Sequence, residues 1–404
     1  MFRVLIVNLV LLVLKEIMDN LKDLFYLNPE ITFLNFGSYG ACPKPIFEDL
    51  QKWQSAMERD PVQFIAVRSI ENLRTSREAL AEYIHCDADD LVYTPNPSYA
   101  MNVIAKSFTM KPGDEILSTN LEYGAMDRTW NYYCKKSGAK FIRNEVSLPV
   151  VSKEKFIEEF WKGYSKNTKA IFISQITSST ALKLPVDEIC SEAKRRGLFT
   201  IVDGAHVPGH IPLDLSKLEV DVYTGACHKW MMTPKGSSFL FVKKEFQDQF
   251  DPLVISWGYE SDAPSESRFI DYHQMQGTRD FTAFLIIPKS IEFMKENNWP
   301  TVAKHCSELA RRNYNKFCNL LKTEPLCPIE NDFLGQMCSI PIKTTKPLVL
   351  KSLLYEKYRI EIPVMVHGNY TFLRYSIQAF NDQDDLDKLY SALKDIQSST
   401  DLLG

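Results

Sequence analysis

Paired cysteines are missing from this sequence of 404 residues: its nine cysteines form no C-x-x-C motif, and their number is odd. Scattered cysteines in a chain of this size are typical of reduced thiols in a cytoplasmic protein, not of a disulfide framework. The histidines also lack the spacing of zinc ligands. We therefore expect a cytoplasmic location and no metal site.

An excess of basic charge is missing too. The formal net charge is −4, and no stripe of lysine and arginine offers a match to a phosphate backbone, so we do not expect a nucleic-acid partner. Hydrophobic residues make up 45% and charged residues 24% of the chain. This composition predicts a substantial core and excludes long disordered stretches.

No apolar run is long enough to make a convincing membrane span. The run Phe2–Leu14 is too short for a bilayer, and no A-x-A-like cleavage site follows it. A second methionine, Met18, begins a polar segment. We interpret residues 1–17 as an over-extended start or a short appended helix, and we do not expect membrane anchoring.

Strand-like and helical patterns alternate through the middle of the chain. The apolar runs at 170–174 and 199–202 are typical of strands buried on both faces, and the helical pattern Val186–Arg196 between them ends at Gly197. This alternation predicts a mostly parallel sheet covered by helices. Further expected elements are helices at 69–84 and 98–107 and strands at 90–93, 221–224 and 239–242.

The pattern changes after about residue 288. A helical stretch at 289–321 is expected to break near Trp299-Pro300. Strands at 336–342, 360–364 and 372–376 are interleaved with helices at 347–357 and 382–396. The fold class is therefore α/β: an N-terminal segment at 1–44, a large domain at 45–287, and a smaller α+β domain at 288–404.

Three segments carry residues suited to chemistry. The buried strand that begins at Thr200 ends in Asp203, at the edge where open α/β sheets bind ligands. His228-Lys229-Trp230 follows another strand. The turn Asn96-Pro97-Ser98 leads from a strand into a helix, whose free N–H groups suit a phosphate.

This combination fits pyridoxal 5′-phosphate (PLP). An aldehyde cofactor needs a lysine amine in its free-base form, and the apolar neighbours of Lys229 would lower the pKa of that amine. Its pyridine nitrogen needs a carboxylate such as Asp203 to remain protonated. The phosphate needs a helix N-terminus and hydroxyl groups.

The amino-acid sequences of these segments also resemble those of a known family. From Leu34 to about Phe380 the sequence is similar to PLP enzymes of aminotransferase class V, which share the aspartate-aminotransferase-like fold type I. It is most similar to the isopenicillin N epimerase-like branch. The segments that carry the resemblance are LNFGSYGACPKP (34–45), GDEILSTNLEYGAM (113–126), SSTALKLPV (178–186), VDGAHVPGHIPLDL (202–215), HKW (228–230) and SWGY (256–259).

The resemblance implies roles for individual residues. Lys229 would form the Schiff base, Asp203 would pair with the pyridine nitrogen, and Tyr123 would stack on the ring. His206 would lie beside the ring. The remaining cofactor contacts that it implies are Ser178 to the ring hydroxyl and Ser98, Thr224 and His228 to the phosphate.

Two further roles concern the substrate and a partner. Arg374 matches the arginine that clamps the substrate carboxylate, for which a planar guanidinium is well suited. The segment 277–280, with Thr278, resembles one that reaches the phosphate of a neighbouring subunit, which implies a homodimer with shared sites. From the residues themselves, Ser38 and Tyr39 are candidates to line the substrate entrance.

The reaction stays open among several alternatives. Epimerisation is expected first, on the resemblance, with Tyr123, Tyr39 or His206 as candidates for the second acid. A carbon–sulfur β-lyase comes close behind, transamination is third, and a non-catalytic binding module is the remaining hypothesis. A persulfide-forming cysteine desulfurase is not expected. The resemblance implies that such an enzyme carries a nucleophilic cysteine in the loop shortly before the arginine matched by Arg374, and residues 359–373 contain no cysteine.

Overall fold

The computed structural model describes residues 21–330 and 332–404. The apolar segment 1–17 of the sequence analysis lies outside this range. A seven-stranded sheet with the order β2-β8-β7-β6-β5-β3-β4 forms the centre of the large domain, and only β8 runs antiparallel to its neighbours. The predicted mostly parallel sheet is therefore confirmed. Its strands are β2 (Leu91–Thr94), β3 (Glu115–Thr119), β4 (Lys140–Asn144), β5 (Thr168–Ser174), β6 (Phe199–Gly204), β7 (Val222–Ala226) and β8 (Ser238–Val242).

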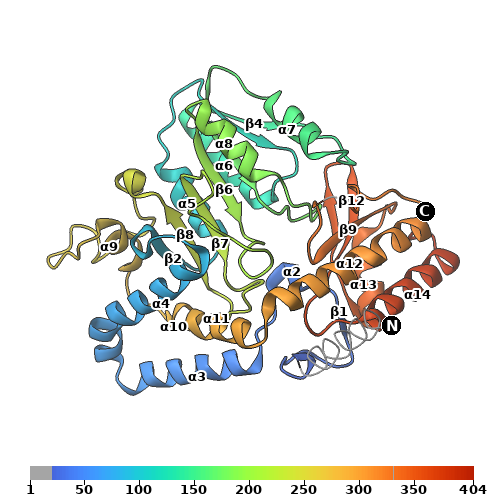
Figure 1. Cartoon of the computed structure of the whole chain (residues 1–404), viewed down its shortest axis with the longest axis horizontal. Coiled ribbons are helices and arrows are strands. Elements are labelled where there is room, and N and C mark those ends of the chain that lie inside the picture. The colour runs from blue at the N-terminus through green and yellow to red at the C-terminus, as the bar shows by residue number, and fades with distance from the viewer. Residues whose placement is uncertain (1–20, 331) are drawn as a thin grey trace, which may run out of the picture.

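Both faces of this sheet are buried, as Figure 1 shows from the helices that cover it. Along β5, Ala170 and Phe172 belong to one apolar cluster, whereas Ile171 and Ile173 belong to another. Successive side chains of a strand point to opposite faces, so a continuous apolar run is what a sheet covered on both sides requires. The covering helices are α4 (Ser69–Ile84), α5 (Pro97–Ser107), α6 (Gly124–Ser137), α7 (Lys153–Trp161) and α8 (Val186–Arg195).

A smaller antiparallel sheet lies beside the large one (Figure 1). It has the order β11-β12-β9, formed by β11 (Val364–His367), β12 (Tyr370–Ser376) and β9 (Met337–Ile342). Three helices belong to the same part of the chain: α12 (Trp299–Leu321), α13 (Pro347–Glu356) and α14 (Gln383–Ser399). The α+β character of the C-terminal part is confirmed.

The predicted single strand at 360–364 is wrong. Only β10 (Ile360–Glu361) forms there before the chain turns, and it pairs in parallel with β1 (Thr32–Phe33) from the start of the described chain. Pro363 follows β10 and has no N–H group to donate to a strand ladder. The chain leaves one sheet at this proline and enters the other at β11.

The long helical stretch breaks where the sequence predicts a break. α11 (Ile287–Glu296) ends two residues before α12, and Asn298 between them has a positive φ of 46°. α11 packs against α3 (Lys44–Arg59) and α4, while α12 packs against β9. A domain boundary near residue 288 stays a prediction. The remaining elements are the short helices α2 (Phe36–Tyr39), α9 (Arg268–Gln274) and α10 (Thr282–Leu285), a π-helical turn at Gln63–Arg68, and 3₁₀ turns at Ala88–Asp90 and Lys244–Gln249.

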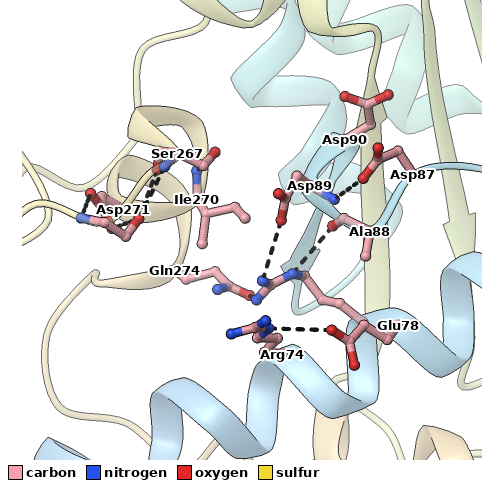
Figure 2. A network of polar contacts seen from close by, with 12 residues as sticks. Arg74, Glu78, Asp87, Ala88, Asp89, Asp90, Ser267, Ile270, Asp271 and Gln274 are labelled. Carbon is pink, nitrogen blue, oxygen red and sulfur yellow. Dashed lines mark hydrogen bonds and ion pairs between the residues drawn. The ribbon is translucent and has the colours of Figure 1, made fainter.

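A polar network ties α9 to α4 and to the turn before β2 (Figure 2). At its centre the buried guanidinium of Arg77 donates to the carbonyl of Ala88 at 3.3 Å and to the side-chain oxygen of Gln274 at 3.1 Å. Arg74, one turn earlier on α4, pairs with Glu78 on the exposed face. The network therefore anchors the segment that runs on from α9 into residues 277–280.

None of the helices in the described part of the chain combines the length and the apolar composition that a membrane crossing needs. Across the same residues, histidine, cysteine, aspartate and glutamate side chains form no group of three that would hold a metal ion.

We predict that Arg77→Met destabilises the protein by about 1–3 kcal/mol, because two partly buried acceptors lose hydrogen bonds from a buried, charged donor. Urea unfolding measures this change. Arg74→Met is the matched control on the same helix, where an exposed ion pair contributes at most about 0.5 kcal/mol. Equal losses in the two variants would contradict the structural role of Arg77.

Candidate active site

A cavity of about 320 Å³ lies at the carboxyl edge of the seven-stranded sheet. The ends of β2, β3, β5, β6 and β7 contribute to its wall, together with α2 and the smaller sheet. Ligands bind at this edge in open parallel sheets. The predicted site residues that line the cavity are Ser38, Tyr39, Asn96, Pro97, Ser98, Tyr123, Ser178, Asp203, His206, His228, Lys229 and Arg374.

Two predicted cofactor residues do not line this cavity. Thr224 is fully buried in β7, and its hydroxyl donates to the carbonyl of Phe239 at 2.8 Å. Thr278 is exposed on the loop after α9, away from the cavity wall. The resemblance assigns Thr278 to the site of a neighbouring subunit, and that role stays a prediction.

Lys229 and Asp203 share the cavity, as the sequence analysis requires. Burial lowers the pKa of Lys229 to about 8, although the carboxylate of Asp203 partly opposes this shift, and the positive charge of Arg374 lowers it further. Burial also raises the pKa of Asp203, while the N–H of Ala205 holds its carboxylate at 2.9 Å. Near neutral pH, an amine with this pKa supplies the free base that an aldehyde needs.

His206 lies directly beside the lysine. Its Nε2 is 3.2 Å from Nζ of Lys229. Burial, reinforced by the charge of Lys229, holds the pKa of His206 well below its usual range, so the ring is neutral at physiological pH. A neutral imidazole in this place accepts one hydrogen bond and donates another without adding a positive charge to the cavity.

The amino end of α5 forms another part of the wall. Asn96 caps this helix by accepting the N–H of Tyr99 at 2.8 Å, and Ser98 lies in the first turn. N–H groups in a first turn have no partner within the helix, which makes this end suitable for a phosphate. His228 lies nearby in the cavity lining, where burial lowers its pKa to about 4 and its Nδ1 donates to the carbonyl of Ser237.

Arg374 of β12 is only 1% exposed, and no carboxylate in the described part of the chain pairs with it. It donates to the backbone carbonyl of Ser178 at 2.7 Å and to the hydroxyl of Ser38 at 3.0 Å, while its Nε has no hydrogen-bond partner among these residues. Burial lowers the pKa of this guanidinium to about 10. A buried cation without an anion is costly, so the geometry favours an anionic ligand here.

A close backbone approach brings the N-terminal segment to the mouth of the cavity. Gly40 has a φ of +66°, and a Cβ atom at this position would lie 2.4 Å from the carbonyl oxygen of His228. Only glycine fits both the conformation and the space. The approach places Ser38 beside Arg374 and Tyr39, which is 72% exposed, at the entrance.

Sequence reasoning missed Glu122, which precedes Tyr123 and is fully buried. Its carboxyl group accepts from the N–H and hydroxyl of Ser174 and from the hydroxyl of Thr119. Burial raises its pKa to about 8, and the charge of Asp203 adds to this shift. The only available signal was its position next to Tyr123, since no strand was predicted before it.

The residues present fit PLP. Lys229 lines the cavity and its Nζ suits the aldehyde, the carboxylate of Asp203 suits a pyridine nitrogen, and the first turn at Ser98 suits the phosphate. The Nε of Arg374, which has no hydrogen-bond partner among the described residues, suits an anionic ligand.

We predict that Asp203→Asn lowers the pKa of Lys229 below about 8, because the attraction that favours the ammonium form is lost. An amine-reactive reagent that modifies Lys229 in the cofactor-free chain measures this shift. Mass spectrometry follows how the extent of modification depends on pH. Glu122→Gln is the control, since Glu122 is not among the charges that act on Lys229. A midpoint unchanged or raised in Asp203→Asn contradicts the coupling.

Comparison with known proteins supports the same cofactor. Isopenicillin N epimerase of Amycolatopsis lactamdurans is 30% identical to this chain over 391 residues, which cover 93% of the chain and 98% of that protein. A probable chloroplastic L-cysteine desulfhydrase of Arabidopsis thaliana is 25% identical over 399 residues, 91% of this chain and 83% of that protein.

Solved structures share the fold. Apo cysteine desulfurase of Thermococcus onnurineus NA1 superimposes with a TM-score of 0.78 at 19% identity, covering 94% of this chain and 97% of that one. The cystine C–S lyase C-DES in complex with cysteine persulfide gives 0.77 at 20% identity, covering 90% and 97%. The aminotransferase class-V family itself matches residues 44–389. The chain therefore belongs to the aminotransferase class-V family and is a PLP-dependent enzyme.

Proposed function

We propose that this enzyme removes the α-proton of an amino acid with a free carboxylate and returns it on the opposite face, as an epimerase or racemase. The observation that carries the proposal is the buried Arg374, which has no carboxylate partner in the described chain. A planar guanidinium binds a carboxylate through two parallel hydrogen bonds. The α-carbon of a substrate held in this way would face the cavity that contains Lys229.

Lys229 is the proposed base. Its pKa of about 8 leaves part of the amine unprotonated near neutral pH, where it can accept a proton from the α-carbon. When bound, PLP supplies a ring that withdraws the electrons released at that carbon. Asp203 supports this role by offering a buried carboxylate on the same cavity wall.

Epimerisation needs a second group that returns a proton to the other face. Tyr123 and Tyr39 both line the cavity and are the exposed candidates, whereas His206 is buried against Lys229. Exposure gives the two tyrosines access to solvent protons. We therefore place the second acid at Tyr123 or Tyr39 ahead of His206.

A carbon–sulfur β-lyase is the second candidate. The similarity to an L-cysteine desulfhydrase supports it, since elimination also starts with loss of the α-proton. It needs only Lys229 and a leaving group that takes up a proton. Transamination ranks third, and a non-catalytic role is disfavoured because Lys229, Asp203 and Arg374 all face one cavity.

We propose that no cysteine persulfide forms here. None of the nine cysteines lines the cavity, and burial raises the pKa of the nearest in sequence to the lysine, Cys227, to about 12. A thiol with this pKa supplies very little thiolate. The same nine unbridged thiols support a cytoplasmic location.

The test is incubation of the holoenzyme with a panel of L- and D-amino acids, including L-cysteine, in deuterated water. We expect deuterium at the α-carbon with inversion, and Lys229→Ala should slow this exchange about 100-fold to 10,000-fold, as removal of a general base does. NMR and chiral chromatography measure both quantities. The corresponding amino-acid amides, which lack the carboxylate, should exchange at least about 10-fold more slowly.

The products separate the alternatives. Release of sulfide and pyruvate from L-cysteine, without inversion of any amino acid, would contradict the epimerase proposal and support the β-lyase. Accumulation of keto acid only in the presence of an amino acceptor would indicate transamination. Absence of exchange, elimination and transfer across the panel would overturn the proposal as a whole.

We also propose a homodimer with shared active sites. The loop that follows β8 exposes large apolar side chains, with Trp257 at 80% and Ile255 at 61% exposure. Exposed apolar residues grouped in this way are typical of protein interfaces. Thr278 lies exposed on the segment that follows α9. The hydrogen bond from Arg77 to Gln274 anchors the end of that helix.

Hybrid dimers test this arrangement. Lys229→Ala and Thr278→Asp should each inactivate the homodimer, the second because a carboxylate repels the phosphate of the partner's site. Mixing the two variants should restore about a quarter of wild-type activity, since half of randomly reassorted dimers are mixed and each holds one intact site. Mixed dimers without recovered activity, or a fully active Thr278→Asp homodimer, would exclude the shared site.

A further inference from the structure

Trp230 follows the catalytic lysine in the chain and is fully buried. Its indole N–H donates to Nδ1 of His206 at 3.3 Å. The other ring nitrogen of His206, Nε2, lies 3.2 Å from Nζ of Lys229. The three side chains therefore form one hydrogen-bonded row that ends at the reactive amine.

The chemistry of the donors sets the direction of this row. An indole nitrogen only donates, so Nδ1 of His206 must be the acceptor and cannot carry a proton. The ring is neutral because it is buried, and its single proton must then be on Nε2. An Nε2–H group faces Nζ of Lys229, and the contact is a hydrogen bond only if Nζ accepts.

An amine accepts only in its uncharged form. A protonated Lys229 would set its own N–H donors against the Nε2–H of His206, and the ring could relieve this conflict only by moving its proton to Nδ1, against the indole. From this geometry we propose that Trp230 is a positioning residue: it fixes the tautomer of His206 and thereby holds Lys229 as a free amine. This role serves epimerisation and β-elimination alike.

Two further rings contact the indole. The ring of His210 stacks on it at 4.0 Å with an angle of 27° between the planes, and Phe36 packs at 5.1 Å. His210 is fixed in turn, because its Nδ1 contacts the carbonyl of His206 at 2.9 Å and its Nε2 accepts the N–H of Gln336 at 2.7 Å. Trp230 cannot rotate its N–H away from His206 without disturbing these contacts.

Other charged groups also act on the lysine. Asp203 favours the ammonium form, whereas Arg374 disfavours it. His228, the residue before Lys229, is neutral near pH 7 because burial lowers its pKa to about 4. The row from Trp230 therefore opposes the one carboxylate that would keep the amine charged.

The tautomer can be read directly in the holoenzyme, since the bond between Trp230 and His206 involves no cofactor atom. With ¹⁵N-labelled histidine, NMR should show Nε2 of His206 in the protonated range and Nδ1 in the unprotonated range, with His206→Gln used to assign the signals. A proton on Nδ1, or an imidazolium at neutral pH, would overturn the proposal.

The effect on the lysine is tested with Trp230→Phe, which keeps a ring in place and removes the N–H. In the full-length chain freed of cofactor, the pH midpoint of Lys229 modification should rise by about one unit, a tenfold loss of free amine below the midpoint. Without the indole, His206 can present a bare Nε2 to an ammonium group.

Trp130→Phe is the matched control. Trp130 is just as buried, and its indole nitrogen has no hydrogen-bond partner among the described residues. This change should leave the midpoint unchanged even if it lowers the thermal stability as much. An unchanged midpoint in Trp230→Phe, with circular dichroism confirming the fold, would reduce the residue to a packing role and refute the inference.

Discussion

The desolvation of one amine is the constraint on which the rest of this structure depends. Lys229 lies in the turn that follows β7, and desolvation lowers its pKa to about 8. Burial alone would make the amine reactive, but a buried ammonium group would also need a negative charge nearby. Asp203 supplies one carboxylate, yet its own burial raises its pKa and limits that effect. The balance among these groups leaves an amine that is both nucleophilic and able to carry a proton.

The fold brings this balance about by collecting side chains from distant parts of the chain. Parallel strands present their carboxyl ends at one edge, so β6 and β7 deliver Asp203 and Lys229 side by side. The N-terminal segment reaches the same edge only because Gly40 allows its backbone to touch that of His228. Arg374 arrives from the smaller sheet and bonds to Ser38 of that segment. The cavity is therefore assembled from segments that lie more than three hundred residues apart in the chain.

Much of this was open to prediction from the sequence, for identifiable reasons. The helix Ser69–Ile84 and the buried strand β5 were visible because apolar periodicity is a local property. Asp203 and Lys229 could be paired because strand ends converge at one edge of a parallel sheet. The strand at 360–364 was wrong because its ladder partner, β1, lies more than three hundred residues away and no local pattern announces it. Thr224 was placed at the phosphate by resemblance; its hydroxyl donates to a carbonyl inside the sheet, and its role at the phosphate stays a prediction.

What remained invisible in the sequence was the direction of hydrogen bonds. Trp230 reads as one more apolar residue, and only its orientation toward His206 gives its N–H a chemical consequence. Glu122 is a similar case: burial raises its pKa and the charge of Asp203 adds to the shift, yet no spacing along the chain reveals that these two residues lie close together. Neither residue lines the cavity, but each forms a hydrogen bond with a residue that does. A scaffold that runs several reactions with the same lysine and carboxylate can therefore differ in residues of this kind, whose orientation decides which neighbouring group carries a proton.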